Sequence, residues 1–301
     1  MDVLTDVLDA LELKGWVASR RELVPPWRYN FVASQDMIFH LLNFGGGYFS
    51  VEGDPMPLRI EDGAVLLLPF GHAHAICDEL ASPLTQVLHI DYSAQREYQG
   101  FAGASEASNL CGAFHVEYPG AFPLLHSLPH VIHIPAEQGR TVPGFAEIVQ
   151  LIAQEATMPR LGTQVMLRRL TELLFIHVIR VWVEQQAAST LGWVAALRDQ
   201  PISTALGLIH QSPERGWKVE ELAKAVALSR AVFSARFTRL VGEPPIKYLT
   251  RWRMYRATRL LKDNVEMEKI AELLGYESTV AFHKAFKREI GMPPARYRKL
   301  G

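Results

Sequence analysis

The stretch GEPPIKYLTRWRMYRATRLL (242–261), followed by KIAELLGYESTVAFHKAFKREIGMPPARYRK (269–299), decides the fold of the last third of this 301-residue chain. Its landmarks occur twice. Counted from Ala223, they are Phe233, Phe237, Gly242, Pro244, Pro245 and Tyr248. Counted from Ala271, they are Phe282, Phe286, Gly291, Pro293, Pro294 and Tyr297. Each of these lies one residue farther from Ala271 than its counterpart lies from Ala223. One unit is therefore used twice, with one extra residue in its turn.

Each repeat has the signals of a helix, a tight turn and a second helix. In the first repeat, Ser229 is a favourable N-cap for a helix that Gly242 ends. In the second repeat, Gly275 supplies the turn and Ser278 caps the following helix. Apolar residues between the repeats predict a connecting helix over 246–262. We therefore expect an all-α domain with two helix-turn-helix units.

The charge of the chain is divided unevenly along its length. Residues 201–301 contain 19 Lys and Arg against 10 Asp and Glu, a net of +9, whereas residues 1–200 contain 12 against 22, a net of −10. A basic, helix-rich block is typical of a phosphate-binding domain, and a basic domain that binds no nucleic acid is the alternative on charge alone. The charge therefore favours a phosphate-rich partner, such as a nucleic acid, for this block.

The two quoted segments resemble the DNA-binding domain of AraC-family transcriptional regulators. The resemblance implies that the second helix of each unit enters a major groove, with the two grooves about one helical turn apart. The side chains expected to meet DNA are Arg230, Ala231, Ser234, Ala235, Arg236, Thr279, Val280, His283, Lys284 and Lys287. Because Ala231 and Ala235 are small, we expect the first unit to read bases weakly, through thymine methyl contacts and through Arg230 and Arg236.

The acidic first part of the chain is patterned as short strands. Runs of strand-forming residues cover 27–32, 38–44, 48–52, 58–60, 64–68, 73–77 and 85–90. Such spacing predicts a sandwich or a barrel. The spacing from Gly63 through Pro69, Gly71 and His74 to Asp78 resembles the second conserved motif of the cupin barrel, with Asp78 at its final Asn position. The expected fold class is α+β: an N-terminal cupin-like β-barrel, a helical linker and a C-terminal all-α domain with two helix-turn-helix units.

The histidines of this region make a metal site one hypothesis. In metal-binding cupins the His of the second motif is a ligand, so the resemblance makes His74 a candidate. The first cupin motif, expected before Gly45, lacks its His-x-His pair here. Together, His40, His74 and His89 would offer three imidazoles to zinc, iron or nickel. The alternative is that these histidines hydrogen-bond a ligand or one another.

Two functions are compatible with a cupin-like barrel joined to a DNA-binding domain. The resemblance to the sensor domains of AraC-family regulators implies a sequence-specific transcriptional regulator, not an enzyme, controlled by a small-molecule effector in the barrel. The candidates for contacting this effector are Trp27, Phe39, His40, Tyr48, His74 and His89. The alternative is a metal-dependent cupin enzyme fused to a DNA-binding domain. The incomplete first motif argues against the enzyme, although fold alone does not decide function.

Amphipathic helices are predicted between the two parts. Apolar residues recur at three- and four-residue steps through 145–152 and 163–185, so each helix has a face that must be covered. The family resemblance favours a homodimer through this segment, and packing on the barrel is the alternative. The expected domains are an effector-sensing domain (1–120), a helical linker and dimerisation segment (121–200) and a DNA-binding domain (201–301). Joints are expected at 187–190 and 199–201.

Composition and segment lengths exclude several other classes of protein. With 49% hydrophobic and 21% charged residues, the chain is neither disordered nor fibrous. Its longest strongly apolar stretch, 173–183, falls short of the ~20 residues that span a bilayer. The acidic N-terminus lacks the pattern of a signal peptide, and two cysteines are too few for a disulfide framework. We expect a cytoplasmic protein that meets no membrane and, if it is an activator, contacts RNA polymerase.

Overall fold

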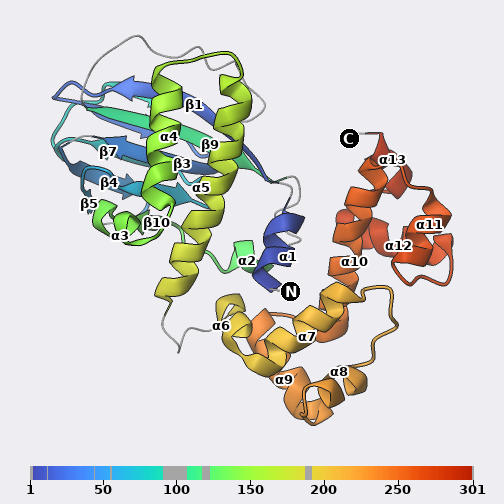
Figure 1. The fold of residues 1–301 in the computed structure, drawn as a ribbon. Helices are drawn as coiled ribbons and strands as arrows, with labels where there is room; N and C mark the ends of the chain where they lie inside the picture. The colour runs from blue at the N-terminus through green and yellow to red at the C-terminus, as the bar shows by residue number, and fades with distance from the viewer. Residues whose placement is uncertain are drawn as a thin grey trace. The chain divides into compact units, whose positions relative to one another are not determined.

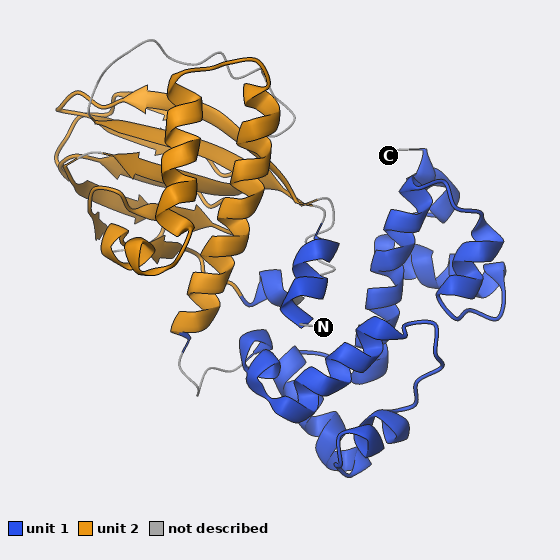
Figure 2. Cartoon of the chain, in the orientation of Figure 1, with its two compact units in different colours: residues 1–11, 118–127, 186–301 blue, residues 12–117, 128–185 orange. Residues whose placement is uncertain are grey.

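The computed structural model describes residues 3–11, 13–43, 45–54, 56–90, 107–116, 123–186 and 192–299. The chain divides into two compact units, which Figure 2 draws in different colours. The sheet unit comprises residues 12–117 and 128–185, and the helical unit comprises residues 1–11, 118–127 and 186–301. The segment predicted as one linker, 121–200, is thus shared between the units, and the predicted joint at 187–190 lies outside the described residues.

The sheet unit is built from two five-stranded sheets (Figure 1). The first has the order β1 (Lys14–Glu22), β9 (Ser108–His115), β3 (Met37–Asn43), β6 (Val65–Leu68) and β10 (Ile132–Ile134). The second has the order β5 (Leu58–Ile60), β4 (Gly47–Val51), β7 (His74–Cys77), β2 (Arg28–Phe31) and β8 (Gln86–Leu88). Paired strands are antiparallel, except that β2 and β8 are parallel. The sequence pattern predicts β2 to β8 and misses β1, β9 and β10.

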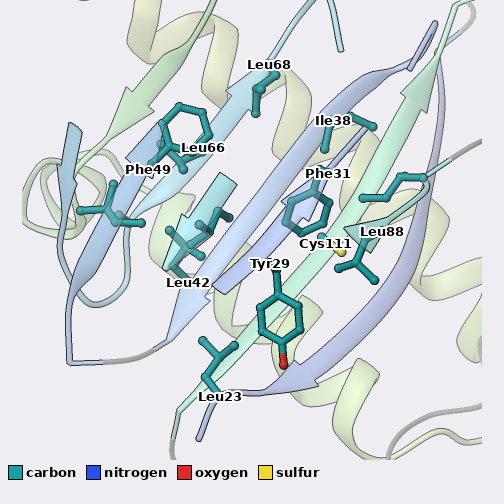
Figure 3. Packing of buried hydrophobic residues seen from close by; sticks show 14 of the residues in the cluster. Leu23, Tyr29, Phe31, Ile38, Leu42, Phe49, Leu66, Leu68, Leu88 and Cys111 are labelled. Carbon is teal, nitrogen blue, oxygen red and sulfur yellow. The ribbon is translucent and has the colours of Figure 1, made fainter. Parts of the chain in front are cut away.

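Apolar side chains fill the space between the two sheets. Figure 3 shows this cluster, with Leu23, Tyr29, Phe31, Ile38, Leu42, Phe49, Leu66, Leu68, Leu88 and Cys111 labelled. On β3, Ile38 and Leu42 point into the cluster, two residues on either side of His40. The alternation of a strand therefore carries His40 into the same interior.

Helices cover the other face of the first sheet (Figure 1). The short helix α3 (Ala136–Thr141) leads to α4 (Phe145–Thr157), which packs on α5 (Thr163–Gln185), and α5 packs on β1. The rings of Phe39, Phe114 and Phe175 follow one another from β3 through β9 to α5, with centroids 4.9 and 5.3 Å apart. Because both faces of this sheet are covered, β3, β6 and β9 are buried along nearly their whole length.

The helical unit contains both predicted helix-turn-helix units. They are preceded by α1 (Val3–Ala10), α2 (Pro123–His126), α6 (Trp193–Arg198) and α7 (Gln200–Gln211). The first unit is α8 (Val219–Ala225) and α9 (Arg230–Val241), and the second is α11 (Met267–Leu273) and α12 (Thr279–Ile290), followed by α13 (Pro294–Arg298). Helix α10 (Pro245–Lys262) lies between them and confirms the predicted connecting helix. Among the described residues, the helices are all too short or too polar to cross a membrane.

The two halves of α10 serve two different cores. Near its start, the Tyr248 ring packs on Phe237 of α9 at 5.9 Å. Near its end, Met254 and Leu261 join a cluster that includes Phe286 of α12. The connecting helix is therefore shared by both helix-turn-helix units.

Candidate DNA interface and sheet interior

Helices α8 and α9 form the first helix-turn-helix unit. Ala227 adopts a left-handed backbone conformation, with φ of 56°, in the turn between them. Ser229 caps α9 by accepting a hydrogen bond from the Val232 N–H at 3.3 Å. Gly242, with φ of 87°, ends the helix. Both predicted ends of α9 are confirmed.

One face of α9 forms an open hollow. It is lined by Arg230, Ala231, Ser234, Ala235, Thr238 and Arg239. Four of the predicted DNA contacts of the first unit therefore lie side by side. The Arg230 guanidinium pairs with Glu220 of α8 at 3.0 Å, at the edge of this face. The centre of the hollow is made of small side chains, which suit methyl contacts with thymine better than bidentate hydrogen bonds to a base.

Arg236 lies apart from the other predicted contacts of α9. Its Nη2 and Nε atoms lie 2.6 and 2.8 Å from Oδ2 of Asp199. The same carboxylate caps α7 by accepting a hydrogen bond from the Ile202 N–H. Arg236 therefore ties the second helix of the first unit to the start of α7. The predicted joint at 199–201 is wrong, because these residues lie inside the helical unit.

Helices α11 and α12 form the second helix-turn-helix unit. The predicted turn residue Gly275 has φ of 70°, and a Cβ there would lie 1.8 Å from the Glu214 carbonyl oxygen. Only glycine permits this approach. Ser278 caps α12 through the Ala281 N–H at 3.2 Å, and Gly291 ends it with φ of 85°. The predicted ends of this helix are also confirmed.

The centre of the exposed face of α12 carries larger side chains than the centre of the α9 face, which is made of alanines. Phe282 and Phe286 are buried beneath it. The outward residues are Thr279, Val280, His283, Lys284 and Lys287, of which Thr279 is half-buried and the others are exposed. This is the position and orientation that a recognition helix requires, because hydrogen-bonding and cationic side chains lie on its open side.

The segment before α8 fixes the first unit against the second. Arg253 of α10 donates hydrogen bonds to the carbonyl oxygens of Pro213 at 2.6 Å and Arg215 at 2.9 Å. Its guanidinium also lies 5.4 Å from the ring of Tyr276, in the turn of the second unit. The Arg253 side chain thus connects the two helix-turn-helix units and is not a free surface charge.

The N-terminal helix α1 also belongs to the helical unit, which the sequence did not predict. Asp6 Oδ2 lies 3.1 Å from Nδ1 of His210 on α7, and His210 Nε2 lies 2.7 Å from the Tyr248 hydroxyl. The imidazole stacks on Trp252 at 3.8 Å. Burial lowers the pKa of His210 to about 4, so the neutral ring donates from Nδ1 to Asp6 and accepts the Tyr248 proton at Nε2.

In the sheet unit, the structure brings together two of the predicted histidines. His40 Nε2 lies 2.8 Å from His74 Nε2, and the Phe31 ring stacks on His74 at 4.6 Å. Burial lowers the pKa of His74 to about 4, and burial together with His74 lowers the pKa of His40 well below its usual value. Both imidazoles are therefore neutral near pH 7.

Hydrogen bonds decide the tautomers of this pair. His74 Nδ1 lies 2.7 Å from the His72 carbonyl oxygen and must donate to it, which leaves His74 Nε2 as an acceptor. His40 Nε2 is then the donor between the rings. In this tautomer His40 Nδ1 is an acceptor. It lies 3.3 Å from the atom placed as Oδ1 of Asn109. The oxygen and nitrogen of an amide have nearly the same shape, so we assign the flipped amide, whose NH2 group donates to His40 Nδ1.

The described residues do not fit the three-imidazole metal site. His89 is exposed, away from His40 and His74, and the part of the chain that the structure describes contains no group of three His, Cys, Asp or Glu able to hold a metal ion. A metal would also separate the two Nε2 atoms, which hydrogen-bond directly. The alternative expectation, that the histidines bond to one another, agrees with the structure.

The remaining predicted effector contacts are spread over different surfaces. Trp27 is a core residue of the interior cluster. Phe39 lies on the opposite face of β3, against Phe114, so it does not line the interior. Tyr48 is half-buried and alternates with the buried Phe49 on β4. Of the six candidates, His40 and His74 are therefore the polar ones that reach the interior.

Comparison with known proteins finds matches to both parts of the chain and to its full length. Two family models match the chain, one described as a cupin over residues 2–184 and one as a helix-turn-helix domain over residues 222–300. A putative AraC-like transcription regulator of Streptomyces antibioticus is 32% identical over 307 residues, covering 99% of both chains. This chain belongs to the AraC family of transcription regulators.

The chain is also similar to another regulator and to a solved DNA-binding domain. The HTH-type transcriptional regulator AlkR of Acinetobacter baylyi is 28% identical over 306 residues, 99% of each chain. The DNA-binding domain of AdpA, solved in complex with a target DNA, is 31% identical and covers 33% of this chain and 91% of that one, with a TM-score of 0.32. The two relatives named here that match over the full length are both named as transcription regulators.

As an AraC-family protein, the chain is a DNA-binding transcription regulator with an N-terminal cupin domain. The exposed faces of α9 and α12 are its candidate DNA-reading surfaces. Sequence reasoning missed Asp199 as the partner of Arg236 and Asp6 as the partner of His210. The only signal for the second pair is the acidity of α1, whose Asp9 also lies 3.8 Å from Arg259 of the basic block.

Proposed function

We propose that a small-molecule effector, bound in the sheet unit, controls DNA binding by this regulator. The observation that supports the proposal is the division of the chain into two units with separate cores. All of the candidate DNA contacts lie in the helical unit, so the sheet unit is available for another ligand. The effector acts by binding one state of the chain better than another. RNA polymerase is a further partner if the regulator is an activator.

The proposal is tested on the full-length protein. Sites are first selected from random duplex DNA, and the dissociation constant for a selected site is then measured by fluorescence anisotropy with and without compounds from a metabolite library. We expect at least one compound to change the affinity about 5-fold or more, the lower range of allosteric coupling. DNA affinity that stays constant with every compound would contradict effector control and leave a constitutive DNA-binding protein.

A homodimer through α4 and α5 is the second part of the proposal. Large apolar side chains are exposed along these helices and the loop between them: Leu151, Met158, Leu161, Val165, Met166 and Leu173. Met166 and Leu173 are seven residues apart on α5 and share one face of that helix. Large apolar side chains exposed together on neighbouring helices are typical of a protein interface when they form one patch, and this supports the proposed dimer.

The dimer is tested by light scattering after gel filtration. The variants Met166→Glu and Leu173→Glu place a charge on the exposed face, where it does not disturb the core of the protomer. We expect the unmodified chain to elute as a dimer and the variants as monomers. Val24→Glu, at an exposed apolar residue of the sheet unit outside these helices, is the matched control and is expected to remain dimeric. Variants that remain dimeric would exclude this face.

A further inference from the structure

A compact loop, residues 212–217, leads from α7 into α8. Its last residue, Trp217, is buried, and the indole N–H donates to the Ser212 carbonyl oxygen at 2.9 Å. The backbone N–H of Trp217 donates to the Arg215 carbonyl oxygen at 2.8 Å, and the Arg215 guanidinium lies 4.0 Å from the centre of the Trp217 ring. Helix α8 begins shortly after, at Val219. The loop therefore determines the position of α8.

Arg253 connects this loop to both helix-turn-helix units. It lies on α10, which runs from the first unit to the second (Figure 1). Its Nε and Nη2 groups donate to the carbonyl oxygens of Pro213 at 2.6 Å and of Arg215 at 2.9 Å. The same guanidinium lies 5.4 Å from the centre of the Tyr276 ring, in the turn of the second unit. One half-buried side chain on the connecting helix thus contacts the loop and the turn at once.

The turn of the second unit also touches the loop directly, at Gly275. A Cβ on this residue would lie 1.8 Å from the Glu214 carbonyl oxygen and 2.6 Å from its carbonyl carbon. Both distances are shorter than a van der Waals contact, so a side chain at residue 275 would push the loop and the turn apart. The two backbones pack together here because glycine has no side chain.

We propose that Arg253 and Gly275 position α9 in the groove next to the one that α12 enters. The two helices must enter major grooves about one helical turn apart, so their relative orientation determines whether both can bind at once. Helix α10 is one connection between the units, and the loop 212–217, held by Arg253 and Gly275, is a second. Two connections leave less freedom between the units than one, so less entropy is lost when both bind. Arg253 and Gly275 are thus positioning residues, and they act whether or not an effector controls the protein.

The test is hydroxyl-radical footprinting of the full-length chain on a site selected from random duplex DNA. We expect each bound protomer to protect two stretches whose centres are about 10 base pairs apart, one under each second helix. The variants Arg230→Glu and Lys284→Glu, on the exposed faces of α9 and α12, identify the two stretches by which of them loses protection. Protection of a single stretch by the unmodified chain would overturn the inference.

Arg253→Lys tests the connection through the guanidinium. Lysine keeps the positive charge, and with it any contact to a phosphate, but it lacks the planar fork of N–H groups that reaches the two carbonyl oxygens. We expect this variant to lose the α9 stretch and to keep the α12 stretch. Arg256→Lys, at an exposed position of the same helix, is the matched control and should keep both. An Arg253→Lys protein that protects both stretches, or that weakens them equally, would contradict the positioning role.

Gly275→Ala tests the backbone contact, and Gly291→Ala is its matched control. The two glycines have positive φ values of 70° and 85°, so alanine adds similar backbone strain at each. A Cβ at residue 291 meets no described residue beyond its chain neighbours within 4 Å, whereas a Cβ at residue 275 meets Glu214. We expect Gly275→Ala to lose the α9 stretch and Gly291→Ala to keep both. Loss of the α9 stretch in both variants, or of the α12 stretch in Gly275→Ala, would exclude the backbone contact as the cause.

The salt dependence of DNA affinity provides a second measurement on Arg253→Lys. The slope of log affinity against log salt changes by about 0.9 for each phosphate contact that is lost. If the first unit leaves the DNA, all of its phosphate contacts are lost together, so we expect the slope to fall by more than about 0.9. A smaller change would show that the first unit still binds DNA in the variant, and the inference would be wrong.

Discussion

The two helix-turn-helix units have the same architecture but present different chemistry to DNA. Each has a serine N-cap and a glycine end on its second helix, which packs phenylalanines into the core. The open face of α9 centres on Ala231 and Ala235, and Arg236 is held by Asp199. The open face of α12 presents His283 and Lys284. We infer that the second unit supplies most of the base preference, whereas the first unit positions the domain and ties it to α7.

The largest expected effect on stability comes from a cavity-forming substitution in the core of one helix-turn-helix unit at a time. Phe237 and Phe286 are both fully buried, and replacing either by Ala is expected to cost about 3–5 kcal/mol. Amide hydrogen exchange should show Phe286→Ala exposing α11 and α12 while α8 and α9 stay protected, and Phe237→Ala doing the reverse. Equal loss of protection in both units after either substitution would show that they form one core.

Acid should selectively weaken the packing of α7, the helix that carries His210. The folded pKa of His210 is about 4, below the 6.5 of an ordinary histidine, so the unfolded chain binds more protons between these values. Stability is therefore lost as pH falls below 6.5, by at most about 1.4 kcal/mol per pH unit. Hydrogen exchange, corrected for its intrinsic pH dependence, should show this loss in α7 but not in α12. In the His210→Gln variant the dependence should disappear, and its persistence would exclude His210 as the cause.

Charge reversal on α12 should weaken specific DNA binding. Lys284→Glu replaces an exposed cation on the open face of α12, and we expect the dissociation constant for a selected site to rise about 10-fold or more, since one good base contact contributes about 1–3 kcal/mol. Lys14→Glu, at an exposed lysine of the sheet unit, is the control for net charge. An unchanged anisotropy curve for a folded Lys284→Glu protein would exclude this face.

The smallest expected effect separates contacts to DNA from contacts within the protein. If Lys287 contacts a phosphate, Lys287→Gln should reduce the slope of log affinity against log salt by about 0.9. Arg236→Gln should leave this slope unchanged, because the guanidinium is already paired with Asp199. A reduced slope for Arg236→Gln would show that the pair opens in the DNA complex.

Local signals in the sequence were sufficient to predict the helices of the two helix-turn-helix units and the helix between them. The caps Ser229 and Ser278, the helix ends at glycine and the connecting helix are where the spacing predicts them, because each depends on neighbours within one or two turns. Two partners were not predictable in this way. Arg236 is 37 residues from Asp199, and His210 is 204 residues from Asp6, so only the folded chain brings them together.

The sheet unit was predicted less completely, also for physical reasons. Strand β1 carries four charged residues and a register shift, and β9 contains Ser, Asn and Gly, which are poor strand formers. Both strands are stabilised by long-range pairing rather than by their own sequence. The pair His40 and His74 was predicted to meet, and it does. His89 was expected with them. Strand β8 ends one residue earlier, at Leu88, and the His89 side chain is exposed.

Selection of binding sites from random duplex DNA tests the central comparison most directly. The full-length chain is compared with an α9 variant, Arg230→Ala with Ser234→Ala, and an α12 variant, His283→Ala with Lys284→Ala. We expect the α9 variant to select nearly the same bases as the unmodified chain, and the α12 variant to lose preference in one half of the site. A site that loses its preference with the α9 variant and keeps it with the α12 variant would contradict the account.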